Sequence, residues 1–322
     1  MHAAAPRIGP RRRCVSAAHG TELDPTSFMI DEGRESSDLE REGLRKRLLN
    51  IEDELRATIP EIQLTSDAPP MRAAVEVAAR AAAHAVPVLL RGESGTGKGA
   101  LARALHALSP RSAGPFGTVS CVAPPAVLSS DLFGMSRRAA ADAGRDTMGH
   151  IDAARGGTLF FDEVGALSLP LQAKILRLLV ESRFERLGEG RSRKADVRIV
   201  AATTHDLEDD VAAGRFRGDV LFRLNVVEIR VPPLRERQED ILELAGRFLT
   251  QFARSARREP PALSASAQQA LAAYRWPGNL RELRNTIERA LILCQGSVID
   301  VDALPERMVG GVLTGAPGAS AS

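Results

Sequence analysis

The sequence predicts an α/β fold with a parallel sheet, followed by a smaller, all-helical domain. Continuous apolar runs at 86–92, 158–163 and 197–203 read as buried strands, and helical stretches separate them. Strands of this kind indicate a parallel sheet that is covered by helices on both faces. Past Pro232-Pro233 only helical patterns follow, which marks the second domain. The predicted helices span 71–85, 98–108, 170–182, 238–256, 264–274 and 279–293.

The composition excludes several classes of protein. The 322 residues carry 43 basic and 41 acidic side chains, so net charge gives no general attraction to nucleic acid or membrane. Aromatic residues make up only 4%, too few for a protein that stacks many bases. The three cysteines lie far apart, which disfavours zinc and disulfide frameworks. No apolar run approaches the roughly 20 residues of a spanning helix, and no signal peptide is recognisable, so a cytoplasmic protein without a membrane partner is expected.

Flanking segments complete the predicted organisation. Residues 1–36 lack periodicity and are expected to be a disordered leader, and the Gly/Ala-rich stretch 310–322 a disordered tail. Between leader and sheet, 37–60 are predicted to form a linker helix, either packed on its own domain or pairing subunits as a short coiled coil. Its apolar residues at helical spacing are Leu44, Leu48, Ile51 and Leu55. The α/β subdomain is then expected over 61–235 and the helical one over 236–309.

A phosphate-binding loop follows the first predicted strand. The string GESGTGKG matches the P-loop pattern, comes directly after a strand and opens a helix. Its glycines let backbone N–H groups surround a phosphate, and its lysine reaches the β- and γ-phosphates. One position departs from the pattern, because glycine stands where most P-loops have a Ser or Thr that holds magnesium. The predicted nucleotide-binding residues are Gly92, Glu93, Ser94, Gly95, Thr96, Gly97, Lys98 and Gly99.

Two acidic residues end the predicted strand TLFFDE, in the Walker B arrangement. Asp162 at the end of this strand would face the P-loop across the sheet, where its carboxylate can hold magnesium directly or through water. The next residue, Glu163, can orient and polarise the attacking water. Asp162 is therefore the predicted metal ligand and Glu163 the predicted catalytic residue.

The chain resembles the central AAA+ ATPase domain of the sigma-54-dependent, NtrC-like transcription activators over about residues 62–309. The resemblance implies an AAA+ P-loop fold with an all-α lid, hydrolysis of ATP with Mg²⁺, assembly with itself into a ring, usually a hexamer, and sigma-54 RNA polymerase as partner. Glycine after the P-loop lysine resembles the alginate-regulator branch. Four stretches in the family's order carry the resemblance: GESGTGKG, ARGGTLFFDEVGALSLPLQAKILRLL at 154–179, FRGDVLFRLNVVEIRVPPLRER at 216–237 and YRWPGNLRELRN at 274–285.

The resemblance also assigns roles to residues outside the P-loop. Arg217 and Arg223 match arginine fingers, which act on the nucleotide of a neighbouring subunit, and a guanidinium there offsets charge on the leaving γ-phosphoryl group. Arg281 matches the sensor II position of the lid, and Thr204 lies at the sensor I position. Ser120 stands where the family usually has an Asn that holds the Walker B glutamate. A Ser hydroxyl is shorter than an Asn amide, so the sequence does not secure that coupling.

The loop that contacts sigma-54 departs from the family pattern. Activators carry GAFTGA a few residues after LFG, whereas the aligned hexamer here is 138–143, RAAADA. Ala140 replaces the Phe and Ala141 the Thr, without a gap in the alignment. Loss of both contacts is expected to weaken sigma-54 engagement, since an aromatic anchor contributes much of an interface's binding energy.

Two functions from different classes remain open at this stage. The chain is either an ATP-hydrolysing transcription regulator of the family, or a nucleotide-dependent interaction module that no longer remodels sigma-54 and acts through a partner or mixed ring. An eroding gene product is a third interpretation, which the intact lysine, Walker B pair and arginine fingers argue against. The stretch before the ATPase is too short for a receiver domain, and the tail cannot form a helix-turn-helix, so no intrinsic DNA-binding domain is expected.

Overall fold

The computed structural model describes residues 43, 46, 64–137 and 146–309. All the elements named below belong to the compact unit formed by residues 47–322. The predicted leader 1–36, the tail 310–322 and the hexamer 138–143 lie outside the described residues. So does the predicted linker helix 37–60, apart from Gly43 and Lys46, which are helical and exposed.

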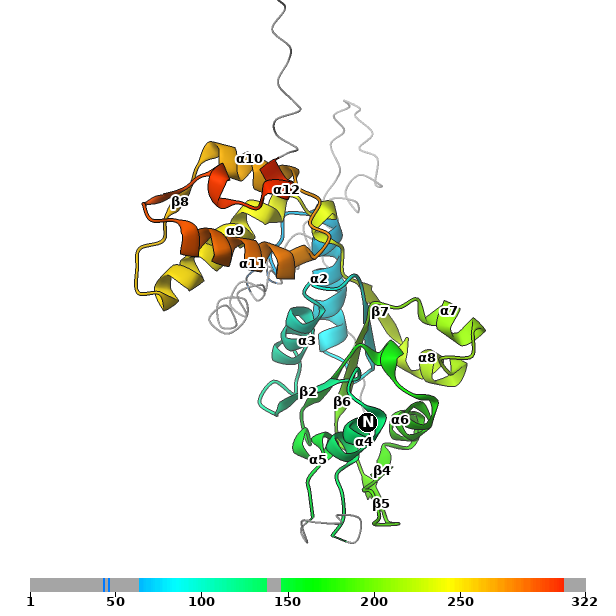
Figure 1. Ribbon diagram of the computed structural model, residues 1–322. Coiled ribbons are helices and arrows are strands. Elements are labelled where there is room, and N and C mark those ends of the chain that lie inside the picture. Colours follow the sequence, from blue (N-terminus) through cyan, green and yellow to red (C-terminus); the bar gives the residue numbers. More distant parts are fainter. Residues whose placement is uncertain (1–42, 44–45, 47–63, 138–145, 310–322) are drawn as a thin grey trace, which may run out of the picture. The chain divides into compact units, whose positions relative to one another are not determined.

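Five parallel strands form the central sheet, in the order β2-β3-β6-β1-β7 (Figure 1). The α/β prediction is confirmed, and the three predicted strands are the three central ones, β1, β3 and β6. The two outer strands, β2 and β7, are only partly buried, so they lack the continuous apolar run by which the others are recognised. The strands span Val88–Arg91 (β1), Phe116–Ser120 (β2), Thr158–Asp162 (β3), Arg198–Thr203 (β6) and Val227–Arg230 (β7).

Helices cover both faces of this sheet. One face packs with α4, α6, α7 and α8 around a core that contains Phe133 and Phe161, and α2 and α3 lie against the other face (Figure 1). A short hairpin of β4 and β5 follows α6. The helices span Pro69–Ala82 (α2), Lys98–Ala107 (α3), Pro125–Phe133 (α4), His150–Ala153 (α5), Leu169–Glu181 (α6), Leu207–Ala212 (α7) and Gly218–Leu224 (α8), with 3₁₀ turns at Val164–Ala166 and Leu234–Glu236, and the hairpin strands span Arg183–Glu185 and Ser192–Lys194.

The helical lid has its own hydrophobic core. Trp276 and Phe248 are fully buried in it, and the indole N–H of Trp276 donates to the carbonyl of Leu271 at 2.9 Å. The predicted helical domain is confirmed, and two two-residue strands, β8 and β9, pair in parallel beside its helices. The lid elements are α9 (Glu239–Ser255), β8 (Ala262–Leu263), α10 (Ala265–Ala273), α11 (Asn279–Leu293), β9 (Val298–Ile299), a 3₁₀ turn (Val301–Ala303) and α12 (Glu306–Val309).

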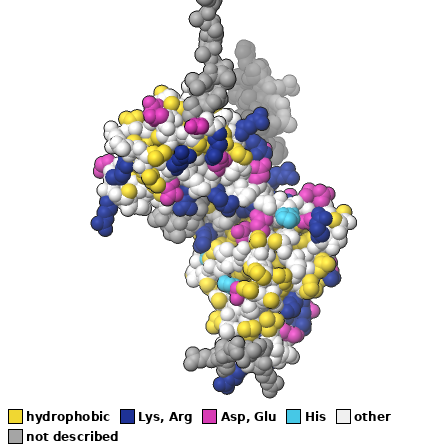
Figure 2. All heavy atoms as spheres, in the orientation of Figure 1, with side chains coloured by type: hydrophobic (Ala, Val, Ile, Leu, Met, Phe, Trp, Pro, Cys, Tyr) yellow, Lys and Arg dark blue, Asp and Glu magenta, His cyan; other side chains and the backbone are white. Residues whose placement is uncertain are grey.

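The surface of the α/β subdomain carries an apolar area. Hydrophobic side chains gather over α4 and α6 on the face seen in Figure 2, whereas charges of both signs are spread over the lid. Val127 on α4, Val180 on α6 and Phe222 on α8 are exposed, Phe222 by 78%. None of the helices in 64–137 and 146–309 combines the length and the apolar character that crossing a bilayer needs.

Candidate nucleotide site

Three strand ends bring the predicted site residues to one edge of the sheet. The P-loop follows β1, Glu163 follows β3, and Thr204 follows β6. The strands are parallel, so these three carboxyl ends lie at the same edge, where ligands of open α/β sheets bind. The order β3-β6-β1 places the end of β6 between the other two, so Thr204 stands between the P-loop and the acidic pair.

The P-loop needs its glycines for two separate reasons. Gly95 and Gly97 adopt left-handed backbone conformations, with φ of 77° and 99°. A Cβ on Gly95 would also lie 2.5 Å from the carbonyl oxygen of Gly278, so the lid packs directly on this turn. The loop then opens α3 at Lys98, with Gly97 as its N-cap residue. Backbone N–H groups at a helix start of this kind form an anion site.

Lys98 is held beneath the P-loop. Its ammonium group donates to the carbonyl oxygens of Gly92 at 2.9 Å and Glu93 at 3.1 Å, and lies 3.5 Å from the Glu163 carboxylate. Burial lowers the pKa of Lys98, and the charges of Glu163 and Asp162 partly offset this effect. Two of its three N–H donors therefore have carbonyl partners, and the ammonium remains beside the space where a phosphate would lie.

Asp162 and Glu163 occupy different environments although they are neighbours in the chain. Burial raises the pKa of Asp162, the charge of Glu163 raises it further, and Lys98 lowers it. Glu163 is the N-cap residue of the 3₁₀ turn Val164–Ala166 and has a left-handed backbone, φ 58°. A half-buried carboxylate with a second one beside it is stabilised by a cation.

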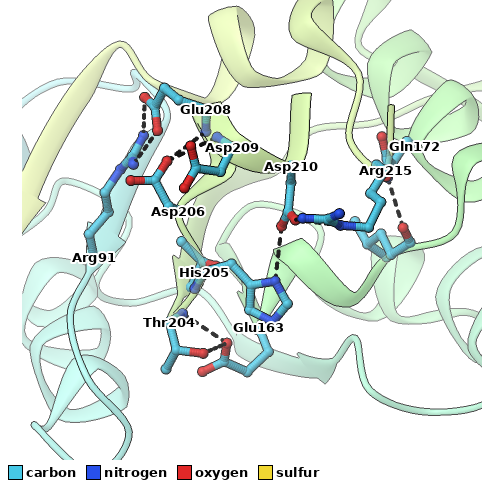
Figure 3. A network of polar contacts seen from close by, with 12 residues as sticks. Arg91, Glu163, Gln172, Thr204, His205, Asp206, Glu208, Asp209, Asp210 and Arg215 are labelled. Atoms are coloured by element: carbon cyan, nitrogen blue, oxygen red, sulfur yellow. Dashed lines mark hydrogen bonds and ion pairs between the residues drawn. The ribbon is translucent and has the colours of Figure 1, made fainter. Parts of the chain in front are cut away.

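The side chain of Glu163 is fixed by Thr204. Its Oε2 atom accepts from the Thr204 backbone N–H at 2.9 Å and from the Thr204 hydroxyl at 2.8 Å (Figure 3). Ser120, the sequence candidate for this task, ends β2 in register with Asp162, and no hydrogen bond of its hydroxyl occurs among the described residues. The residue at the sensor I position thus makes the contact that the family resemblance assigns to the position of Ser120.

The lid contacts the P-loop through Arg281, which the sequence predicts, and through Asn279 and Arg237, which it does not. The predicted sensor II residue Arg281 donates to the Ser94 hydroxyl at 2.8 Å. The buried amide of Asn279 donates to the Ser94 carbonyl at 3.0 Å, and buried Arg237 donates to the Thr96 carbonyl at 2.7 Å. Burial lowers the pKa of Arg237 to about 10. Asn279 is the first residue of the helix that carries Arg281. Its position two residues before the predicted lid arginine is the sequence signal that could have identified it.

A cavity of about 530 Å³ joins these groups, within the usual size range of ligand pockets. Thr96 is buried and is not part of the lining. Gly92 and Glu93 contact the cavity indirectly by accepting from Lys98, and Thr204 does so by donating to Glu163. Aromatic and basic side chains, among them Phe160 and Arg103, extend it along α3. The predicted residues that line it are Ser94, Gly95, Gly97, Lys98, Gly99, Asp162, Glu163 and Arg281.

The donor set fits magnesium held mainly by a nucleotide. Among residues 43, 46, 64–137 and 146–309, no group of three or more His, Cys, Asp and Glu side chains forms a protein-only metal site. Magnesium in phosphate-transfer sites takes one or two carboxylates and completes its shell with phosphate oxygens and water. Asp162, half-buried with an unfavourable excess of negative charge, is suited to such a role.

The two predicted arginine fingers lie away from this cavity. Arg217 caps α8, and its guanidinium pairs with the Asp219 carboxylate at 2.8 Å. Arg223, near the other end of α8, is exposed and has no hydrogen bond or ion pair to any described residue. Neither arginine is among the described residues that line the cavity.

Comparison with known proteins agrees with this architecture. Residues 64–230 match the model of the sigma-54 interaction domain, and 235–319 match that of the AAA+ ATPase lid domain. The alginate biosynthesis transcriptional regulatory protein AlgB of Pseudomonas aeruginosa is 47% identical over 267 residues, covering 83% of this chain and 59% of that protein. The Nif-specific regulatory protein of Herbaspirillum seropedicae is 49% identical over 213 residues, covering 66% of this chain and 39% of that protein.

Solved structures show the same fold. NtrX of Brucella abortus in complex with ATP aligns with a TM-score of 0.72 at 35% identity, covering 93% of this chain and 64% of that one. Its complex with ADP gives the same TM-score, 0.72, at 34% identity. The chain spans less than two thirds of the length of the relatives named here.

Proposed function

The chain belongs to the family of AAA+ ATPases that carry a sigma-54 interaction domain, and on that premise we propose that it binds and hydrolyses ATP with magnesium at the interface between subunits of a ring. The observation that carries this proposal is the convergence of Lys98, Asp162 and Glu163 on one cavity beneath the P-loop. A lysine, a carboxylate for the metal and a second carboxylate for water are the groups that phosphoryl transfer to water requires.

Each group has one task in this reaction. Lys98 contacts the β- and γ-phosphates, and Asp162 holds the magnesium ion. When bound, the ion would neutralise charge on the phosphate oxygens. Glu163 orients the attacking water and accepts its proton, and its orientation depends on the two donors of Thr204. Arg281 links the lid to the P-loop through Ser94, so lid movement and nucleotide occupancy are coupled.

Arginines from a neighbouring subunit complete the site. Arg217 and Arg223 do not line the cavity of their own chain, yet the second is exposed and without a partner in the described part of the chain. A guanidinium that enters from a neighbour would stabilise the charge that develops on the γ-phosphoryl group. Exposed apolar side chains on the same subdomain, including Phe222 beside Arg223, support burial of this surface against another subunit. A hexamer is the ring size that the family resemblance favours.

The output of this ATPase is proposed to be altered. The relatives are named as transcriptional regulators, so regulation of transcription with sigma-54 polymerase is the first expectation. The substituted hexamer 138–143 favours the second function, a module that hydrolyses ATP but does not remodel sigma-54 by itself and acts through a partner or mixed ring.

The basic test measures ATP binding and steady-state hydrolysis by the purified protein. Lys98→Ala is expected to weaken nucleotide binding, whereas Glu163→Gln is expected to keep binding and lose most hydrolysis. Lys174→Ala serves as control, because Lys174 is exposed on α6 and its ammonium group, within the described part of the chain, interacts with Ser129 and Phe133 and not with the cavity. Absence of both binding and turnover in the wild-type protein would show the proposed function to be wrong.

A further inference from the structure

The segment Arg215–Arg217 leads into α8 and is held by a buried amide. Gln172 on α6 is fully buried, and its Oε1 atom accepts from the Arg217 backbone N–H at 2.8 Å. Its Nε2 atom donates to the carbonyl oxygens of Arg215 at 3.0 Å and Leu167 at 2.8 Å. The amide orientation is unambiguous, because an N–H can only donate and a carbonyl can only accept. An amide is the side-chain group that meets both needs here.

A second contact holds the same segment from the other side. The carboxylate of Asp210, 5% exposed, accepts from Arg215 Nε at 2.8 Å and from His205 Nδ1 at 2.9 Å (Figure 3). His205 directly follows Thr204, whose two donors hold Glu163. The segment before α8 is therefore attached both to α6 and to the turn that orients the catalytic carboxylate of the same subunit.

These contacts control where the arginine at the start of α8 can reach. The side chain of Arg217 is 44% exposed and donates two hydrogen bonds to the Asp219 carboxylate, so it can exchange this partner for another anion. Its backbone has no such freedom, because the Arg217 N–H is bonded to Gln172 in the interior. A long side chain reaches a defined point only when its Cα is fixed, and the amide fixes it.

We propose that Gln172 is a positioning residue for Arg217, setting the place from which one subunit presents this arginine to the nucleotide of its neighbour. The role rests on the trans-acting function of Arg217 proposed above. Asp210 and His205 contribute to this positioning, because they connect the segment Arg215–Arg217 to the turn that holds the subunit's own Glu163. A subunit would then present its arginine in a way that depends on the state of its own site.

Mixing experiments separate this role from a structural one. Gln172→Met keeps the size of the side chain and removes both hydrogen-bonding ends. Alone, it is expected to lower ATP hydrolysis at least tenfold and leave ATP affinity unchanged. Mixed with Lys98→Ala subunits, which lack a phosphate site but present an intact segment, it should regain activity. Mixed with Arg217→Ala subunits it should not, since neither partner then presents a usable arginine.

Control measurements distinguish a failure of the role proposed for Gln172 from a failure of the proposed function. Gln268→Met removes an exposed lid amide that, among the described residues, donates to the Leu263 carbonyl, and it should leave hydrolysis unchanged. A mixture of Lys98→Ala and Arg217→Ala subunits tests whether Arg217 of one subunit acts on the nucleotide of its neighbour. If this mixture stays inactive, the proposed function is wrong in that part, whatever the role of Gln172. Thermal unfolding without nucleotide reports whether each variant is folded.

Three results would overturn the role of Gln172. They are full activity of Gln172→Met alone, recovery with Arg217→Ala subunits but not with Lys98→Ala subunits, and recovery with neither although the variant is folded. If Gln172→Met does not fold, Gln172→Asn, which keeps an amide but shortens its reach by one methylene, takes its place in the same mixtures, with the same outcomes deciding.

Discussion

Thr204 directs both its backbone N–H and its hydroxyl at one oxygen of Glu163, at 2.9 and 2.8 Å. The other carboxylate oxygen of Glu163 lies 3.5 Å from the Lys98 ammonium. The carboxylate proposed to polarise water is thus held at one oxygen by Thr204, directly after β6, and attracted at the other by the P-loop lysine. An ATP γ-phosphate that approached Lys98 would compete for that second contact and release one side of Glu163.

Removal of the Thr204 hydroxyl is expected to reduce catalysis and spare binding. Thr204→Val keeps the shape and the backbone donor but loses the 2.8 Å hydrogen bond to Glu163. A hydrogen bond to a charged group contributes about 1.5–3 kcal/mol, so kcat should fall by about tenfold to a hundredfold. ATP affinity, measured by a binding titration, should stay within about twofold. Thr250→Val, which removes a hydroxyl bonded within α9, is the control. Unchanged kcat in Thr204→Val would exclude a positioning role for this hydroxyl.

The sequence predicted the parts of the site that depend on local pattern. The P-loop, the Walker B pair and the central strands follow from glycine spacing and continuous apolar runs. The Glu163–Thr204 bond joins residues 41 positions apart, and the Asn279–Ser94 bond joins residues 185 apart. Contacts of this kind are set by strand order and lid packing, which periodicity does not encode. Gln172 was missed for the same reason, since a buried glutamine within an amphipathic helix has no local signature.

Gly99 is predicted to weaken magnesium binding at the site, and a serine at this position should restore it. A Cβ at this position would lie 3.9 Å from the Phe160 ring, an ordinary contact, so Gly99→Ser fits without strain. A serine hydroxyl there would supply the metal contact that most P-loops have. We expect half-maximal hydrolysis at a several-fold lower Mg²⁺ concentration. Gly99→Ala should share the gain in helix stability, about 0.5–1 kcal/mol, and leave the Mg²⁺ dependence unchanged. Equal Mg²⁺ curves for the serine and alanine variants would argue against the metal role.

Asp210 is predicted to stabilise the fold in a pH-dependent way. Burial tends to raise its pKa, but the hydrogen bonds from His205 and Arg215 outweigh burial, so its pKa lies below the ordinary value. A lowered pKa in the folded state contributes stability above the unfolded value, about 4, and this contribution is lost as pH falls through the folded value. Asp210→Asn should therefore lower the free energy of unfolding by about 1–2 kcal/mol at pH 7.

Denaturant titrations at several pH values test this expectation. The difference between wild type and Asp210→Asn should shrink below about pH 4, where the unfolded chain takes up a proton at Asp210, and vanish as pH falls through the lower pKa of the folded state. Asp131→Asn, at an exposed position on α4, is the control and should match the wild type throughout. A difference that stays constant down to acid pH would mean that the Asn variant perturbs packing and that the ion pairs contribute little.

Finally, the substituted hexamer 138–143 is predicted to separate ATP hydrolysis from transcription activation. The residues that stand for Phe and Thr of the family loop are Ala140 and Ala141, and small side chains offer little area for a partner to bind. Replacing a buried aromatic anchor by alanine removes about 2–4 kcal/mol at a well-packed interface. Arg138 and Asp142 also add charge where the family has glycine, which disfavours the usual partner. The wild-type protein should therefore hydrolyse ATP and fail to form open complexes with sigma-54 polymerase.

The decisive comparison restores GAFTGA at 138–143 and measures open-complex formation at a protein concentration high enough that recruitment is not limiting. A matched variant with GAAAGA at the same positions keeps the glycines and lacks only the Phe and the Thr. If those two side chains supply the missing contact, the restored loop should activate transcription and the matched variant should not, while all three proteins hydrolyse ATP at similar rates. Activation by the unmodified protein would disprove the hypothesis that the substituted hexamer prevents transcription activation. Activation by both loop variants would shift the cause to the charges of Arg138 and Asp142, because those are the differences from the wild type that both variants share.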